Sequence, residues 1–128
     1  MLRVFSLAFV SLFFCSGLYA GPPQCATQSS GATYCSYYGK VERIYVNNGS
    51  LILLYFEQPF AQETLDQYGF SAISREATAF YIPDNPEFAQ FFYSTALSAQ
   101  ATGRPINIQM RNTYGSYLKF DRIWLSKP

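Results

Sequence analysis

Residues 85–103 read NPEFAQFFYSTALSAQATG and carry the strongest local structural signal in the chain. Asn85 is a good helix N-cap, Pro86 suits the first helical position, and Glu87 complements the positive end of the helix dipole. Gly103 is the residue type that most often follows the last turn of a helix. The stretch therefore predicts one long helix with a defined start and a defined end.

The predicted helix has two different faces. One is a stripe of apolar and small residues at helical spacing, which should pack on the rest of the protein. This stripe consists of Phe88, Phe91, Phe92, Thr95, Ala96 and Ala99. The opposite face has no charge after Glu87, whereas a face turned to open water usually carries several. We therefore expect a subunit interface there, with an ordinary exposed face as the alternative. Its residues are Gln90, Tyr93, Ser94, Leu97, Ser98 and Ala101.

Strand patterns lie on both sides of this helix. The predicted strands cover residues 41–46, 51–56 and 77–82 before it, and residues 106–110 and 117–125 after it. The second of them is almost entirely apolar, which is typical of a strand buried on both faces. Three strands, a helix and two strands is the order of an OB-fold, a five-stranded small barrel with its helix between strands 3 and 4. Such barrels usually bind sugars or nucleic acid.

The connections carry further signals. Asn47-Asn48-Gly49-Ser50 contains the Asn-Gly pair of a tight hairpin, where positive φ angles are needed. Residues 57–76 fit either a short helix over 62–68 or an extended loop. In the fourth predicted strand Ile106, Ile108 and Met110 should point inward, while Asn107, Gln109 and Arg111 point outward. The alternation of the last strand breaks at Asp121-Arg122, which indicates a bulge.

The first twenty residues resemble a secretory leader. Arg3 supplies a positive charge, residues 4–14 are mostly apolar, and small residues near Ala20 indicate cleavage after it. We therefore expect a secreted or periplasmic protein without a permanent membrane span. The chain then divides into a signal peptide (1–20), a disulfide-tied, irregular N-terminal arm (21–39) and an OB-fold domain (40–128).

Cysteine and histidine usage limits the chemistry. Cys15 leaves with the leader, and the remaining pair, Cys25 and Cys35, most simply forms a disulfide in an oxidising compartment, with two free thiols as the alternative. The chain has no histidine and no CxxC pair. A zinc or haem site is therefore not expected, and no cofactor is predicted.

Charge and motifs also narrow the function. Loss of Arg3 leaves eight basic residues against eight acidic ones, so the processed chain is neutral. A nucleic-acid-binding OB-fold normally needs a basic groove, so nucleic acid is not the expected ligand. The acidic residues show no recognisable catalytic arrangement, and no serine lies in a nucleophile elbow. We therefore expect a binding protein rather than an enzyme.

Three segments resemble a known family. They are KVERIYVNNGS at 40–50, FFYST at 91–95 and GRPINI at 103–108. In type and spacing they are similar to the B subunit of subtilase cytotoxin and its small exported relatives. The resemblance implies an OB-fold that assembles into rings of five, with the helices lining the centre. It also implies binding of sialylated host-cell glycans and delivery of a separate catalytic A subunit.

The resemblance also suggests a sugar site just before the first predicted strand. The matching segment contains Tyr34, Ser36, Tyr37 and Tyr38, with Ser36 as ligand for a sugar carboxylate and the tyrosines as stacking faces. Family members often hold a disulfide between the second and third strands, but residues 51–56 and 77–82 contain no cysteine. Two alternatives therefore stay open. The arm packs its own tyrosines, or the protein is an envelope interaction module without sugar binding.

Overall fold

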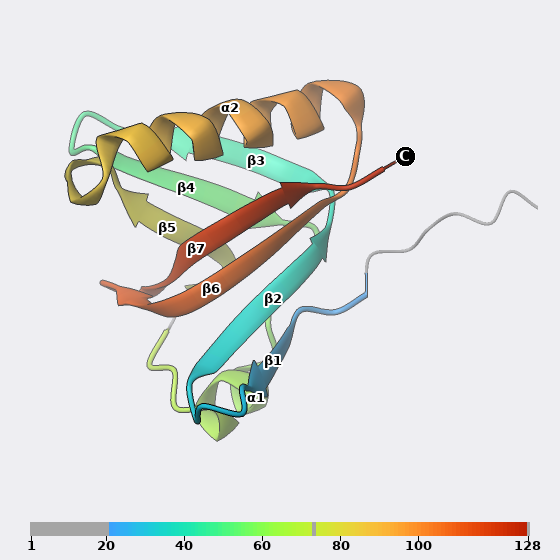
Figure 1. The fold of residues 1–128 in the computed structure, drawn as a ribbon, viewed down its shortest axis with the longest axis vertical. Coiled ribbons are helices and arrows are strands. Elements are labelled where there is room, and N and C mark those ends of the chain that lie inside the picture. Colours follow the sequence, from blue (N-terminus) through green and yellow to red (C-terminus); the bar gives the residue numbers. More distant parts are fainter. Residues whose placement is uncertain (1–20, 73, 128) are drawn as a thin grey trace, which may run out of the picture.

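The computed structural model of the protein describes residues 21–72 and 74–127. The predicted signal peptide lies outside these residues. Seven strands form one mixed sheet in the order β1-β2-β6-β7-β5-β4-β3 (Figure 1). The strands are β1 (Gln24–Thr27), β2 (Thr33–Gly39), β3 (Val41–Val46), β4 (Leu51–Phe56), β5 (Ser74–Tyr81), β6 (Ile106–Tyr114) and β7 (Tyr117–Leu125). The helices are α1 (Gln62–Gln67) and α2 (Pro86–Thr102), with a 3₁₀ turn at Ile82–Asp84.

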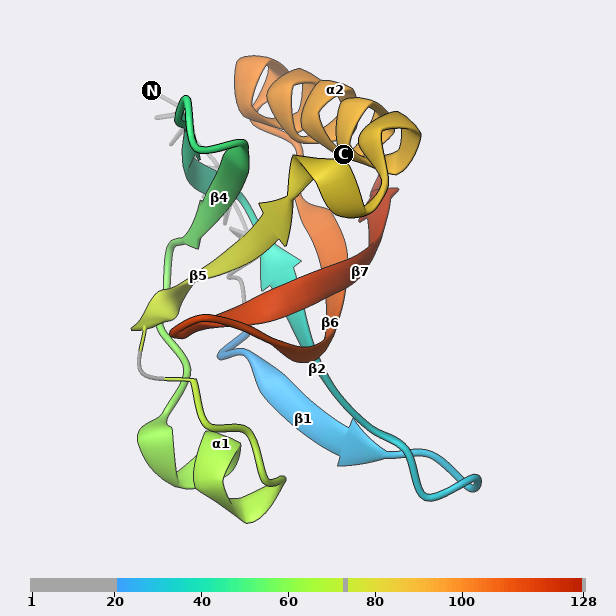
Figure 2. The ribbon, with the colours of Figure 1, turned by 90° about the vertical axis from the view of Figure 1, so that its left-hand side faces the viewer.

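The sheet is strongly twisted, as Figure 2 shows, but it is open. β5 and β7 pair in parallel, and the other neighbouring strands pair antiparallel. β1 and β3 are the two edge strands in the ladder. The expectation of a mainly β protein with one long helix between β5 and β6 is confirmed. The closed five-stranded barrel stays a prediction.

The core lies inside the curled sheet. Figure 1 shows β7, β6 and β2 in front of β4 and β5, with α2 across the top and α1 at the bottom. Ile106, Ile108 and Met110 are fully buried, as predicted from their alternation. α2 contributes Ala89, Phe92, Ala96 and Ala99 to the same cluster. The same cluster contains Cys35 and Tyr37 of β2, so residues from both halves of the chain are buried in one core.

The capping of α2 matches the prediction, but one residue of its buried stripe does not. The Asn85 side chain accepts a hydrogen bond from the Phe88 N–H at 3.0 Å, and Gly103 adopts φ 65°. Phe91, however, is 63% exposed, whereas Phe92 is fully buried. Successive helical residues are ~100° apart around the axis, and this step places Phe91 outside the side of α2 that Phe92, Ala96 and Ala99 turn to the core. Ala89, which was not part of the predicted stripe, is buried instead.

The connection between β3 and β4 differs from the predicted tight Asn-Gly turn. The last pair before it joins Val46 with Ile52, and the Asn47 N–H donates to the Leu51 carbonyl at 3.1 Å. The positive φ angle falls on Ser50, at 63°, rather than on Asn48 or Gly49. The turn is therefore one residue longer than expected, with its left-handed residue at the end, which is typical of three-residue hairpin loops.

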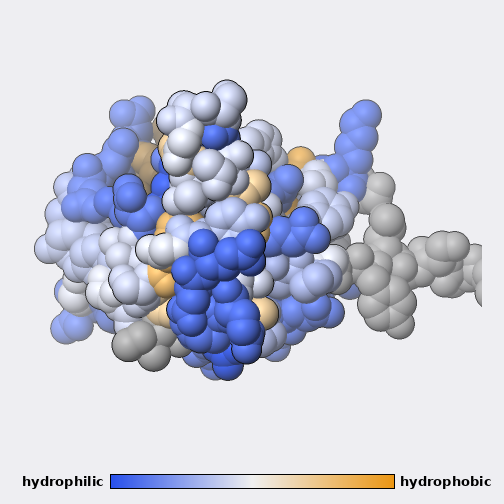
Figure 3. All heavy atoms as spheres, turned by 90° about the horizontal axis from the view of Figure 1, so that it is seen from below, coloured by the Kyte–Doolittle hydropathy of each residue, from blue (hydrophilic) through white to orange (hydrophobic). Residues whose placement is uncertain are grey.

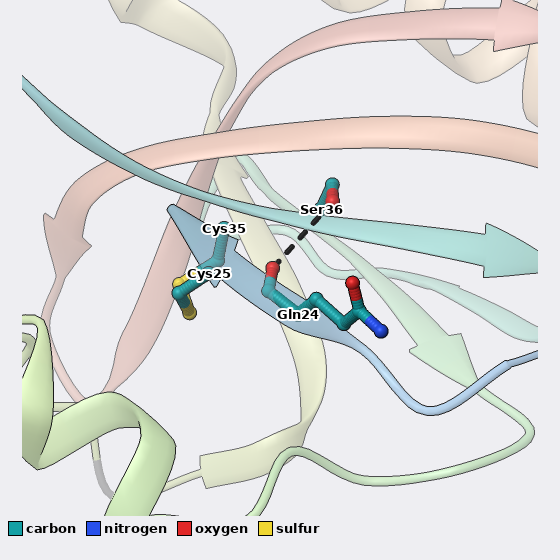
Figure 4. Close-up of a disulfide and its surroundings, with 4 residues drawn as sticks. All are labelled: Gln24, Cys25, Cys35 and Ser36. Carbon is teal, nitrogen blue, oxygen red and sulfur yellow. Dashed lines mark hydrogen bonds between the residues drawn. A yellow bond between two sulfur atoms is a disulfide. The ribbon is translucent and has the colours of Figure 1, made fainter. Parts of the chain in front are cut away.

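The N-terminal arm is not irregular. β1 and β2 form an antiparallel hairpin in which Cys25 and Cys35 lie directly opposite each other and form the predicted disulfide (Figure 4). The bond closes a loop with a sequence separation of 10. In the loop-entropy model such a bond stabilises the folded state by about 3 kcal/mol. β2 also pairs with β6, so the arm belongs to the main sheet.

The remaining elements are close to the prediction. Of the two alternatives for residues 57–76, the short helix is correct, because α1 begins at Gln62. The bulge at Asp121 is confirmed, since Gln109 pairs with Arg122 and Met110 with Phe120, which leaves Asp121 unpaired. β6 continues to Tyr114, further than expected. Viewed from the α1 end, the molecular surface is mainly hydrophilic (Figure 3).

Candidate functional site

The tyrosine-rich segment of the predicted sugar site forms strand β2. Tyr34, Ser36 and Tyr38 point away from the core, because Cys35 and Tyr37 between them are fully buried. The structure therefore brings three of the four predicted residues together on one outward face. Tyr38 is the most open of the three, with 38% of its surface exposed.

Tyr37 is a correction to the predicted site. Its ring is fully buried, with its centroid 4.5 Å from that of Phe56, so it offers no open face to a ligand. Its hydroxyl donates to the Lys40 carbonyl at 2.6 Å and accepts from the Glu57 N–H at 3.2 Å. Burial raises the pKa of Tyr37 to about 12. Tyr37 thus clamps the bend between β2 and β3 and belongs to the core.

Two neighbouring strands extend the outward face of β2. Tyr38 pairs with Asn107 of β6, which pairs with Trp124 of β7, so the three side chains form a row on one side of the sheet. Trp124 is 47% exposed. Because neighbouring strands are 4.7–4.9 Å apart, the two aromatic residues are ~10 Å apart along the row. An amide thus lies between two exposed aromatic side chains.

A second row is polar. Gln24 pairs with Ser36, Ser36 with Gln109, and Gln109 with Arg122. The Ser36 hydroxyl is 3.5 Å from the Gln24 carbonyl, a long contact that leaves it open to a better acceptor (Figure 4). The Gln109 Oε1 atom is buried and has no hydrogen-bond partner among the described residues. The row therefore offers hydroxyl, amide and guanidinium groups beside the aromatic row.

Two arginines near these rows share one carboxylate. Asp121 Oδ2 lies 3.2 Å from Arg122 Nε and 3.3 Å from Arg111 Nε. The Arg111 guanidinium is also 5.9 Å from the ring centroid of Tyr34. We call the whole surface the β2–β6–β7 face. It consists of Tyr34, Ser36, Tyr38, Asn107, Gln109, Arg111, Arg122 and Trp124.

Sequence reasoning missed part of this face. Asn107, Gln109 and Arg111 were expected to point outward, but nothing in the sequence showed that they lie beside Ser36 and Tyr38. That neighbourhood depends on the pairing of β2 with β6, and residues 21–39 were expected to be irregular. Trp124 is the only tryptophan of the chain and lies in a strand of alternating pattern. That alternation could have indicated that its side chain points outward.

The residues predicted to form a subunit interface are all exposed on α2. Leu97 is 45% and Tyr93 37% exposed. A groove of about 410 Å³ lies between the first half of α2 and the β3–β4 hairpin. It is lined by Val46, Ile52, Ile82, Pro86, Ala89, Gln90 and Tyr93. Exposed apolar side chains thus gather on α2 and the neighbouring β3–β4 hairpin.

Residues 21–72 and 74–127 offer little basis for metal chemistry or membrane insertion by a helix. They contain no group of three or more histidine, cysteine, aspartate or glutamate side chains that could hold a metal ion. Neither helix of this part of the chain has the length and apolar character needed to cross a membrane. Comparison of the chain with protein-family models, curated proteins and solved structures gives no match.

Proposed function

We propose that this protein is an exported glycan-binding protein without catalytic activity. The observation that carries the proposal is the row formed by Tyr38, Asn107 and Trp124 on the outside of the sheet. Aromatic rings offer flat apolar surfaces to the C–H faces of a sugar ring, and amides bind its hydroxyls. Two exposed aromatics ~10 Å apart match the length of a short oligosaccharide.

We further propose that the fold is an OB-fold. β2 and β3 are separated only by Lys40 and act as one bent strand. The first half of this strand pairs with β6 and the second half with β4. The remaining pairs, β4 with β5, β5 with β7 and β7 with β6, complete a circuit back to the same strand. This circuit supports the proposal, as does the position of α2 between β5 and β6.

Export of the protein rests on the predicted leader and is supported by the disulfide, because disulfides persist in oxidising compartments. The proposals of a sialylated ligand and of a catalytic A subunit rest on the family resemblance alone. Ser36 stays the expected ligand for the carboxylate of such a sugar, and Arg122, whose side chain is 56% exposed, lies in the same row.

Glycan binding is tested on an array that carries neutral and sialylated oligosaccharides. We expect the processed, oxidised protein to bind a subset of them. Trp124→Ala should weaken binding of a soluble glycan from that subset by about tenfold or more, which corresponds to ~1.4 kcal/mol. Titration calorimetry with the free glycan measures the affinity without contributions from multivalent binding.

Tyr93→Ala is the matched control, because Tyr93 is as exposed as Tyr38 but lies on α2. Its affinity should equal that of the wild type. Trp124→Phe should retain part of the affinity because a ring remains. Absence of binding to every glycan, or equal affinity of Trp124→Ala and the wild type, would overturn the proposal.

We also propose that copies of the chain associate through the exposed face of α2. The absence of charge between Phe88 and Gly103 supports this, because no like charges would repel across such a contact. The family resemblance implies rings of five, and head-to-tail contacts close into rings. Light scattering of the processed chain should therefore give a mass of several chains.

Charges on the α2 face test this association directly. Ser94→Lys combined with Leu97→Glu should reduce the mass to that of one chain. The control, Ser29→Lys with Ser30→Glu, carries the same charges on the exposed β1–β2 turn and should leave the mass unchanged. A wild-type mass of one chain would contradict the association. Together with an empty glycan array, it would favour the envelope interaction module.

A further inference from the structure

We propose that the opposite wall of the sheet carries a second binding site, for a neutral oligosaccharide. It lies on the outward side of β3, β4 and β5 and at the end of β6, and it does not depend on the β2–β6–β7 face. We call it the tyrosine face. It consists of Arg43, Tyr45, Tyr55, Tyr81 and Tyr114 over a floor of Leu53, Ala77 and Ala79.

The floor is buried without being part of the core. Leu53 is 4%, Ala77 1% and Ala79 0% exposed, yet none of them belongs to the core cluster. Leu53 pairs with Ala79, and their neighbours along β4 and β5 point into the core. These three side chains therefore point outward and are covered by larger neighbours on the same side of the sheet.

The covering side chains are aromatic. Tyr45 pairs with Leu53, and Tyr55 pairs with Ala77. The rings of Tyr81 and Tyr114 stack at a centroid distance of 5.4 Å with 12° between their planes. Because the side chains of Ala77 and Ala79 are small, such rings can lie close to the backbone of β5. The result is a broad aromatic surface.

The hydroxyls of this surface are available to a ligand. None of the hydroxyls of Tyr45, Tyr55, Tyr81 and Tyr114 hydrogen-bonds to a residue that the structure describes. Tyr37 differs, because its hydroxyl holds two backbone groups. Each outward tyrosine can thus both donate to and accept from a ligand while its ring packs against it.

Among the described residues few charges surround the tyrosine face, and the ion pair beside it is neutral overall. The Arg43 guanidinium lies 3.9 Å from the ring centroid of Tyr55. Lys119, which pairs with Ala79, is held by Asp84 at 2.5 Å. This is not the continuous basic track that a nucleic-acid backbone requires. An aromatic surface with free hydroxyls and few charges fits a neutral polyhydroxylated ring, which is a sugar without carboxylate or phosphate.

The test is a titration of the processed protein, labelled at alanine methyl groups, with four neutral tetrasaccharides. The probes are maltotetraose, cellotetraose, mannotetraose and N-acetylchitotetraose. We expect at least one of them, at millimolar concentration, to shift the methyl signals of Ala77 and Ala79 in a saturable manner. The floor methyls report this site directly, because both lie under the tyrosines.

Variants then separate the two faces. Tyr81→Ala should lower the affinity for the tetrasaccharide by at least tenfold. Tyr81→Phe keeps the ring that stacks on Tyr114 but loses one hydroxyl. It should therefore lower the affinity for the tetrasaccharide only severalfold. Trp124→Ala should leave this affinity unchanged, since Trp124 lies on the other face.

Failure of all four probes to shift the Ala77 and Ala79 signals, or equal affinity of Tyr81→Ala and the wild type, overturns the second site. Binding on the array that depends on Trp124 alone would still support the proposed function.

Discussion

Phe92→Ala should destabilise the protein by about 3–5 kcal/mol. Phe92 is fully buried and stacks on Phe120, with 9° between the ring planes. Its removal opens a cavity between α2 and β7 that rigid strands cannot fill. Because small domains have total stabilities of about 5–15 kcal/mol, this is a large part of the free energy of unfolding. Denaturation by guanidinium, followed by circular dichroism, measures the change.

The neighbouring residue is the control. Phe91→Ala removes the same side chain one position earlier, but Phe91 is 63% exposed. Its effect on the free energy of unfolding should stay within about 0.5 kcal/mol, as for most surface substitutions. If Phe91→Ala destabilises the protein as much as Phe92→Ala, the orientation of α2 is wrong. The pair thus tests which side of the helix faces the core.

The second large effect is a loss of stability in alkaline solution. Tyr37 has a pKa of about 12 in the folded state against 10.0 as its ordinary value, because burial disfavours the phenolate. The folded state therefore holds the proton more tightly. The stabilisation is fully present below pH 10 and is lost as the pH rises from 10 to 12. A shift of this size corresponds to about 3 kcal/mol.

Urea denaturation between pH 8 and pH 11.5 measures this loss. Tyr37→Phe cannot ionise and should lack this part of the pH dependence, although loss of the hydroxyl contacts with Lys40 and Glu57 costs it about 1–2 kcal/mol at neutral pH. Tyr38→Phe, one residue further and exposed, should follow the wild-type profile. A Tyr37→Phe profile parallel to that of the wild type throughout would contradict the role of Tyr37.

The parts of the fold that could be predicted are those with local physical causes. Asn85, Pro86 and Gly103 act on their own helix ends, so the bounds of α2 follow from a few neighbouring residues. β4 and β7 follow from apolar runs and alternation. Phe91 was misplaced because the helical stripe of apolar residues is wider than the strip of α2 that contacts the sheet.

The parts that could not be predicted depend on distant partners. β1 and β2 are rich in small and polar residues, and they are strands because of the Cys25–Cys35 bond and the pairing of β2 with β6. Tyr34, Ser36 and Tyr38 were found as candidates by their type. That Tyr37 points into the core while these three point outward can be inferred only once β2 is known to be a strand with one buried side.

The open sheet has a consequence for behaviour at high concentration. Exposed edge strands can recruit strands from other molecules and start fibrils. Here β1 has only four residues and follows Pro22-Pro23, while β3 carries Glu42 and Arg43 beside an irregular register. The Gln100 amide also donates to the Glu42 carbonyl at 3.4 Å. These features discourage cross-β growth, so concentrated solutions should contain finite complexes joined by side chains rather than amyloid.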